Sequence, residues 1–338
     1  MSKQRDITLQ MLAQRLNMHP STVSRVLNAT PETAAKAASP ETIARIQALA
    51  AQWDYRPNPY AISLRKNRSN LIGVVIPRIT DLVLAFIYEG IDQAARRHAY
   101  FTFVTNSYDD PEIQSRLINE ITRRRVDGFI IGDARVDAAE RPPLGTMHIP
   151  VVLVNRRAGN LPSVTVDDYH GGRLAALHLL EQGHRRVGII AGLAFVSTGQ
   201  ERTAGFVDAF RDAGVAIDPR CIVHAPFDTA AGHATATRIL SLSPRPTALF
   251  AVNDFGAIGA MGAVREAGLV IGKDIAVVGF NDIPLAAELP VPLTTIRSPL
   301  WDIGYKGMEL LLGLLRGEEV DSVRLAPELV VRASSLRG

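Results

Sequence analysis

Short apolar segments alternate with longer amphipathic stretches from residue 71 almost to the end of the chain. The apolar segments are rich in β-branched residues and read, in order, LIGVVIP, YFTFVTN, GFIIG, VVLVN, VGIIAG, ALFAVND and IAVVGFND. Helices are expected between them, near residues 82–98, 111–125, 170–182, 202–213, 230–241, 254–267 and 300–316. Strands that alternate with helices form parallel sheets covered on both faces. The predicted fold class is therefore α/β, and two such series in more than 250 residues predict two doubly wound parallel-sheet lobes.

Several side chains directly follow these predicted strands. Ligands of an open parallel sheet bind outside the carboxyl ends of its strands, so the sequence predicts a binding cleft between the two lobes. The residues expected at its wall on this ground are Asp81, Val83, Leu84, Ser107, Tyr108, Asp133, Asn155 and Arg156. Taken singly, each can equally be an ordinary loop residue, and only their shared position at strand ends favours a site.

Charge is distributed unevenly along the 338 residues. Residues 1–70 carry a net charge of +6 and the remainder carries −3. This asymmetry is typical of a protein that binds a polyanion at one end, with a merely solvated basic surface as the alternative.

Composition excludes several classes of protein. A single cysteine, Cys221, rules out a disulfide framework and a cysteine metal site, and we expect it to be a small buried apolar residue. The histidines show no metal-binding spacing, so no metal and no cofactor are expected. No apolar run reaches bilayer length and the N-terminus lacks a signal-peptide pattern, which predicts a cytoplasmic protein with no membrane partner.

The first 56 residues predict a small all-α domain. A helix with one apolar stripe is expected over residues 9–16, with Thr8 as its N-cap. After a turn at residues 17–19, Pro20 occupies the first position of a second helix, where proline is tolerated. Branched aliphatic residues face inward from this helix, while small hydroxyl residues and Arg25 remain outside. The pattern predicts a helix-turn-helix, whose second helix enters the major groove, or else an ordinary helical hairpin with a polar outer face.

Two further helices are indicated before residue 71. Ser39 and Pro40 begin a third helix, with Ser39 as its N-cap. Residues 60–64 have room for little more than one turn of helix, which is marginal in water on its own. Because basic residues follow it, we expect residues 57–70 to be a hinge that folds on binding.

The N-terminal sequence resembles the LacI family of bacterial transcriptional regulators. The segments that carry the resemblance are ITLQMLAQRLN, STVSRVLN, SPETIARIQALA and YRPNPYAISLRKNRSNLIGVVIP. The resemblance implies that residues 1–56 bind DNA, that Pro20, Ser21 and Arg25 read bases, and that Leu64 inserts into the minor groove. The other implied DNA contacts are Thr8, Thr22, Ser24, Asn28, Ser39, Thr42, Tyr55, Asn58, Ala61 and Arg65. One departure is the stretch ATPETAAKAA, which is longer than the family usually has and puts the backbone contacts of the third helix in question.

The resemblance continues through the body, residues 71–338. It implies a fold like that of the periplasmic sugar-binding proteins, with lobe one over about 71–166 and 299–326 and lobe two over about 167–298 and 327–338. It also implies effector contacts at Arg202, Phe227, Asn253, Asn281 and Leu300. No heptad extension follows residue 337, so a homodimer on a pseudo-palindromic double-stranded operator is expected rather than a tetramer.

Two asparagines depart from the family pattern in the cleft. At positions 155 and 281 the family often has aspartate, whereas this chain keeps Arg156 and Arg202 nearby. Fewer carboxylates beside two arginines favour anions, because opposite charges attract strongly in a partly desolvated cleft. The expected effector is therefore a sugar acid or sugar phosphate, with a neutral sugar as the alternative.

Other classes of function fit less well. The chain has no G-x-S-x-G, P-loop or dinucleotide-binding motif that favours an enzyme. A free transport protein would have a secretion signal and no basic head. A sequence-specific regulator, acting as a repressor released by its effector, is therefore the predicted function. An activator or a corepressor-dependent regulator of the same family is the alternative.

Overall fold

The computed structural model describes residues 7–28, 30–55, 68–137 and 149–336. The chain forms two compact units, Met1–Asn70 and Leu71–Gly338, which are called the head and the body.

The head is a cluster of short helices around one small apolar core. Its helices are α1 (Leu9–Leu16), α2 (Pro20–Asn28), α3 (Pro31–Ala37) and α4 (Pro40–Gln52). Thr8 caps α1 by accepting a hydrogen bond from the Met11 N–H at 3.3 Å, and Ser39 caps α4 by accepting from the Thr42 N–H at 3.3 Å. The buried core consists of Leu12, Ala13, Val23, Val26, Ile46 and Ala50.

Helix α3 occupies the stretch ATPETAAKAA. Thr30 accepts from the Thr33 N–H at 3.4 Å, and Pro31 stands in the first turn, where its missing N–H costs nothing. Ala34 is buried, so α3 packs against α2 and extends the head rather than forming an open loop.

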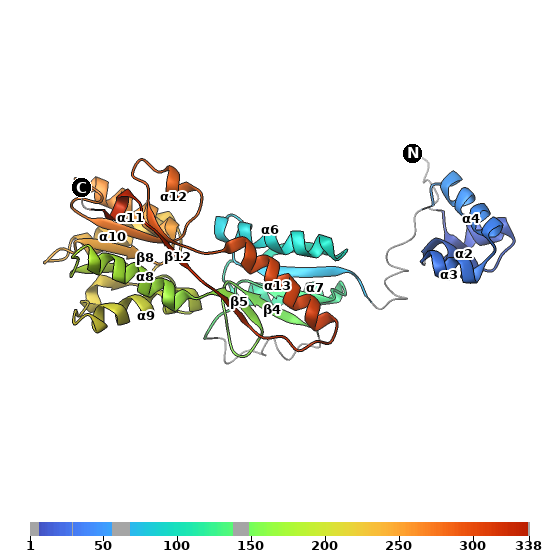
Figure 1. Cartoon of the computed structure of the whole chain (residues 1–338), viewed down its shortest axis with the longest axis horizontal. Coiled ribbons are helices and arrows are strands. Elements are labelled where there is room, and N and C mark those ends of the chain that lie inside the picture. Colours follow the sequence, from blue (N-terminus) through green and yellow to red (C-terminus); the bar gives the residue numbers. More distant parts are fainter. Residues whose placement is uncertain (1–6, 29, 56–67, 138–148, 337–338) are drawn as a thin grey trace. The chain divides into compact units, whose positions relative to one another are not determined.

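The body contains two six-stranded sheets (Figure 1). The first has the order β11-β5-β4-β3-β1-β2 and the second β12-β10-β9-β8-β6-β7. The strands of the first sheet are β1 (Leu71–Ile76), β2 (Phe101–Asn106), β3 (Gly128–Ile131), β4 (Val151–Val154), β5 (Ser163–Val166) and β11 (Val323–Leu325). Those of the second are β6 (Val187–Ile190), β7 (Ile222–Val223), β8 (Ala248–Ala251), β9 (Ala276–Asn281), β10 (Thr294–Arg297) and β12 (Glu328–Val330). All described neighbours pair in parallel except β12, which is antiparallel to β10.

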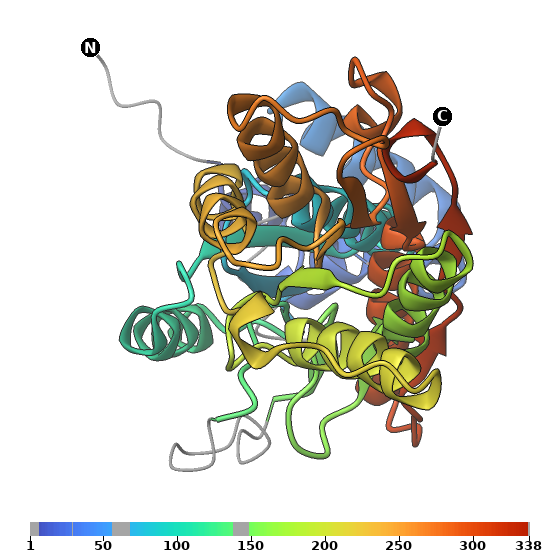
Figure 2. The same cartoon turned by 90° about the vertical axis from the view of Figure 1, so that its left-hand side faces the viewer.

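Helices cover both faces of each sheet, so the predicted α/β class with two doubly wound lobes is confirmed. The helices are α6 (Leu82–Arg97), α7 (Pro111–Arg123), α8 (Asp168–Glu181), α9 (Ser197–Asp212), α10 (Thr229–Leu240), α11 (Asp254–Glu266), α12 (Leu285–Glu288) and α13 (Leu300–Leu315). In lobe one, α6 and α13 pack on one face and α7 on the other. In lobe two, α8 and α9 lie across the sheet from α10 and α11 (Figure 2).

Glycines allow three pairs of helices to approach very closely. A Cβ on Gly172 of α8 would lie 2.1 Å from the Arg202 carbonyl oxygen, and one on Gly205 of α9 would lie 2.0 Å from that of Tyr169. The pairs α6–α13 and α10–α11 are built in the same reciprocal way. The close α8–α9 contact fixes the start of α9, which enters the binding site.

The chain passes between the two sheets at three places. It leaves β5 at Val166 for α8, leaves β10 at Arg297 for α13, and leaves β11 at Leu325 for β12. In the first sheet β1 lies between β2 and β3, and in the second sheet β6 lies between β7 and β8. The connections therefore run in both directions from the first strand of each lobe. Such a switch point opens a crevice at the carboxyl ends of the strands.

Candidate effector pocket and DNA-reading surface

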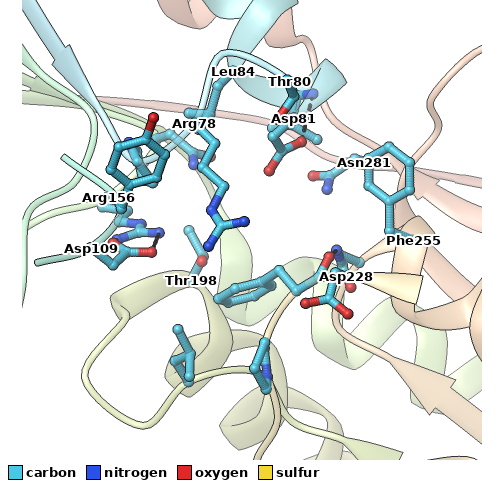
Figure 3. Close-up of a pocket in the computed structure, with 18 of the residues that line it drawn as sticks. Arg78, Thr80, Asp81, Leu84, Asp109, Arg156, Thr198, Asp228, Phe255 and Asn281 are labelled. Carbon is cyan, nitrogen blue, oxygen red and sulfur yellow. Dashed lines mark hydrogen bonds and ion pairs between the residues drawn. The ribbon is translucent and has the colours of Figure 1, made fainter. Parts of the chain in front are cut away.

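A pocket of about 460 Å³ lies at the carboxyl ends of the strands of both sheets (Figure 3). Ten of the residues expected there line it, namely Asp81, Val83, Leu84, Tyr108, Asn155, Arg156, Arg202, Phe227, Asn253 and Asn281. The volume is typical of a site for one small molecule.

Arg202 is held rigidly in the wall that lobe two contributes. Its Nε donates to Asp168 Oδ1 at 2.7 Å, its Nη1 donates to the Val252 carbonyl at 2.7 Å, and its guanidinium stacks 3.8 Å from the ring centroid of Phe280. Burial raises the pKa of Asp168 to about 6, although the charge of Arg202 opposes that rise. Only Nη2 of this guanidinium has no hydrogen-bond partner in the described part of the chain, so Arg202 presents a single free donor edge.

Arg156 is paired in the same manner in lobe one. Its Nη1 donates to Asp109 Oδ1 at 2.5 Å and its Nη2 to Oδ2 at 3.3 Å. The positive excess that the sequence predicted from Arg156 and Arg202 is therefore absent, because Asp109 and Asp168 neutralise both. Neither aspartate was among the predicted site residues.

Two amides of lobe two are also fixed in place. The Asn253 Nδ2 donates to the Phe227 carbonyl at 2.7 Å and its Oδ1 accepts from the Gly256 N–H at 3.1 Å, so this side chain caps α11 and holds Phe227. Asn281 Oδ1 accepts from the Ser298 hydroxyl at 3.3 Å, which leaves its Nδ2 available.

A buried carboxyl lies next to these amides. Asp254 accepts from the Thr295 hydroxyl at 2.6 Å and from the Ile283 N–H at 2.8 Å. Burial raises the pKa of Asp254 to about 7 despite these hydrogen bonds.

Lobe one supplies more exposed groups. Asp81 caps α6 by accepting from the Val83 N–H at 3.0 Å, and burial raises its pKa. Asn155 lies in the left-handed region at φ +64°, which turns the chain at the end of β4. Tyr108 is 55% exposed, and the Arg78 guanidinium lies 5.7 Å from the centroid of its ring.

Three predicted effector residues lie outside the pocket lining. Ser107 is fully buried and donates to the Ile76 carbonyl at 3.3 Å. Asp133 is buried, accepts from Gln114 Nε2 at 2.7 Å, and has a pKa raised by burial. Leu300 belongs to the apolar core at the start of α13. All three side chains are buried behind the wall of the pocket and are not exposed to it.

Several lining residues were not predicted. They are Pro77, Arg78, Thr80, Asp109, Leu193, Thr198, Pro226, Asp228, Thr229 and Phe255. Most follow a strand by only a few residues, so a wider window after each strand would have found them. Thr198 is different, because it lies eight residues after the end of β6, in the first turn of α9, and only the fold brings it to the wall.

The two lobes also touch directly beside the pocket. The Arg157 N–H donates to the Ser197 hydroxyl at 3.0 Å, and its guanidinium pairs with Glu201. The Arg135 guanidinium lies 3.5 Å from the ring centroid of Phe195. These contacts hold the lobes together around the site.

The head presents a polar surface on α2. Ser21 and Arg25 are exposed, whereas Val23 and Val26 on the same helix are buried. The remaining predicted DNA contacts in the described head are Thr8, Pro20, Thr22, Ser24, Asn28, Ser39, Thr42 and Tyr55, and all are exposed or half-buried. Asn58, Ala61, Leu64 and Arg65, which were predicted for the hinge, lie outside the described residues.

Together, a helix-turn-helix head and a two-lobed body with a pocket between parallel sheets define a ligand-responsive DNA-binding regulator. Residues 176–335 match the family described as a periplasmic binding protein-like domain. Among the residues that the structure describes, each helix is too short or too polar to cross a lipid bilayer.

Known proteins are similar over nearly the whole chain. The transcriptional repressor CytR of Escherichia coli K12 is 31% identical, covering 97% of this chain and 96% of its own length. The repressor PurR of Klebsiella pneumoniae is 30% identical, covering 98% and 97%. The chain belongs to the LacI family of bacterial transcriptional regulators.

Solved structures agree with this assignment. The Lac repressor dimer bound to operator and the anti-inducer ONPF superposes with a TM-score of 0.87 at 26% identity, over 98% of this chain and 100% of that one. The complex of the regulator CelR with cellobiose superposes at 0.71 and 27% identity, over 97% and 99%. The predicted family and its regulatory function are thereby confirmed.

Proposed function

We propose that this protein is a homodimeric repressor that binds a pseudo-palindromic operator and releases it when a small polyhydroxylated effector enters the pocket. The pocket supports this proposal most directly. It combines the aromatic faces of Phe227 and Phe255 with free amide and carboxylate edges, which suits hydroxyl groups on a ring. Because the pocket lies between the lobes, an effector changes their relative position, and the head responds through a shift in population.

Three features of the proposal concern its setting. The relatives named above are transcriptional repressors, which supports binding without catalysis. The proposed DNA binding supports a cytoplasmic location. The exposed Arg25 on α2 is proposed to read a guanine in each half-site.

A selection from a randomised duplex pool with the full-length chain tests the DNA-binding part. A palindromic consensus is expected, and Arg25→Ala should cost roughly 1–3 kcal/mol at one base position in each half-site. Arg45→Ala, which removes an exposed positive charge from α4, is the matched control and should weaken all sequences alike. If the intact protein enriches no sequence, the proposal is wrong.

A thermal-shift screen of sugars and sugar derivatives tests the effector part. Compounds that stabilise the protein are then added to the operator complex. Loss of the complex supports induction by release, whereas tighter binding would show a corepressor instead.

A further inference from the structure

Arg78 differs from the other charged groups of the pocket. Arg156 and Arg202 are each paired with an aspartate at 2.5 Å and 2.7 Å. In the described part of the chain, Arg78 has no carboxylate partner, and its recorded contact is the ring of Tyr108 at 5.7 Å. Its guanidinium points into the pocket (Figure 3). A ligand that covers Arg78 removes water from an uncompensated cation, which is unfavourable unless the ligand supplies a negative charge.

Two aspartates of the lining, unlike Arg78, already have a stabilising partner in the protein. Asp81 accepts the Val83 N–H at the start of α6, and Asp228 accepts the Ala231 N–H at 2.8 Å at the start of α10. A helix N-terminus stabilises a negative charge. Both aspartates therefore keep a favourable partner when a ligand enters, and each has one oxygen left for a hydroxyl group of that ligand.

The lobe-two wall offers donors of the kind that an anion needs. Helix α9 begins after Val196, and no side chain caps the N–H groups of its first turn. Thr198, in that turn, is only 3% exposed and lines the pocket, yet its hydroxyl has no hydrogen-bond partner among the described residues. Arg202 lies one helical turn further on the same face, with Nη2 free. Uncapped N–H groups, a buried hydroxyl and a guanidinium edge together form an anion-binding wall.

We infer that the effector carries a carboxylate or phosphate group, bound between Arg78 of lobe one and the start of α9 in lobe two. This inference rests on the proposed effector pocket. The ligand's hydroxyl groups then face Asp81, Asp228 and Asn281. Because the anion contacts both lobes, it draws them together, and its neutral counterpart lacks that bridge.

Titration calorimetry of the full-length protein tests this inference with matched probes. Glucuronate is compared with glucose, ribose 5-phosphate with ribose, and inorganic phosphate with chloride at equal ionic strength. The variants are Arg78→Gln, which removes the charge but keeps a polar side chain, and Thr198→Val, which keeps the side-chain shape. Arg96→Gln is the control. Arg96 is exposed on α6 and pairs with Asp92 outside the pocket lining, so its loss removes the same charge from the same lobe.

At least one acidic probe should bind more tightly than its neutral partner, and Arg78→Gln should weaken it roughly tenfold to a hundredfold. Arg96→Gln should leave that preference unchanged, and Thr198→Val should reduce it by a smaller factor. The two acidic organic probes distinguish a carboxylate from a phosphate ligand. The basic head can also bind phosphate, but both arginine variants keep the head intact. Phosphate bound by the head therefore does not contribute to the difference between Arg78→Gln and Arg96→Gln.

The inference is overturned if no acidic probe shows binding that depends on Arg78, or if Arg78→Gln weakens acidic and neutral probes equally. Either result leaves the proposed regulatory function standing, because operator selection measures that function without any effector. Conversely, a protein that binds acidic sugars through Arg78 but selects no operator would retain the anion site and lose the proposed function.

Discussion

The two lobes contribute to the pocket in different ways. Lobe two buries most of its polar lining, with Thr198 and Arg202 each 3% exposed and Asn281 4% exposed, although Asp228 and Thr229 are exposed. Lobe one presents Arg78 and Tyr108, which are exposed, and Asp81, which is half-buried. Hydrogen bonds fix most polar groups of lobe two before any ligand arrives, so lobe two is the preorganised wall. In lobe one, Arg156 and Asp81 already have partners, but Arg78 gains a charged partner only when the site is filled.

The paired arginines provide the strongest test of this difference. Arg202 and Asp168 have side chains 4% and 3% exposed, whereas Arg156 and Asp109 are 6% and 19% exposed. Arg202→Met should lower the free energy of unfolding by about 3–5 kcal/mol, because it leaves a buried carboxylate without its partner. Arg156→Met should cost only about 1–3 kcal/mol, since water reaches Asp109. Urea unfolding measures both, and adding Asp168→Asn to Arg202→Met should restore part of the loss. Equal costs in the two lobes would contradict the distinction.

The two asparagines at strand ends provide a test of intermediate size. Both have positive φ, +64° at Asn155 and +113° at Asn281. Asn155→Ala should cost about 1 kcal/mol of unfolding free energy from the left-handed backbone alone, and Asn155→Gly should recover most of it. Asn281→Ala should cost about 2–3 kcal/mol, because it also removes the hydrogen bond from the buried Ser298. A larger loss at Asn155 than at Asn281 would contradict the assignment of the preorganised wall to lobe two.

The pH dependence of stability is the most gradual effect, because it is spread over several pH units. Asp254 has a folded-state pKa of about 7, well above its value in an unfolded chain, so the folded protein binds this proton more strongly. Stability should therefore fall as pH rises from roughly 4 to 7, by at most about 1.4 kcal/mol per pH unit for this carboxyl, and then level off. Urea unfolding between pH 5 and 8 should show a shallower slope for Asp254→Asn.

Asp81→Asn in lobe one is the control for that slope. Burial raises the pKa of Asp81, but the Val83 N–H and the charge of Arg156 oppose the rise. Its replacement should therefore change the slope less than Asp254→Asn does. If the slope of stability against pH is unchanged in Asp254→Asn, this carboxyl does not cause the pH dependence.

Much of the head was predictable because its signals are local. The predicted helix over residues 9–16 and its Thr8 cap agree with α1, and Pro20 does begin α2. Helix α3 was missed although Thr30-Pro31-Glu32-Thr33 repeats the pattern Ser39-Pro40-Glu41-Thr42. The same cap-and-proline chemistry begins α3 and α4, so the repeat itself was the signal.

The body was predictable where strands have a strong apolar pattern and less so where strands are short or partly polar. The seven apolar segments correspond to central strands and to β2. The strands β5, β7, β10, β11 and β12 were not predicted, because two or three residues, or four that include serine or threonine, carry little apolar pattern. The antiparallel direction of β12 arises where the chain returns from lobe one to lobe two, which no local signal specifies.

The sequence by itself determined the alternation of strands and helices, the capped helices of the head and the approximate position of the pocket. These features depend on periodicity and on residues close together in the chain. Only the tertiary structure decided which charges in the pocket are cancelled. Asp109 and Asp168 are 47 and 34 residues from the arginines that they neutralise, while Arg78 is left without a carboxylate among the described residues. Coulomb attraction depends on distance in space, and that distance exists only once the sheets bring the strand ends together.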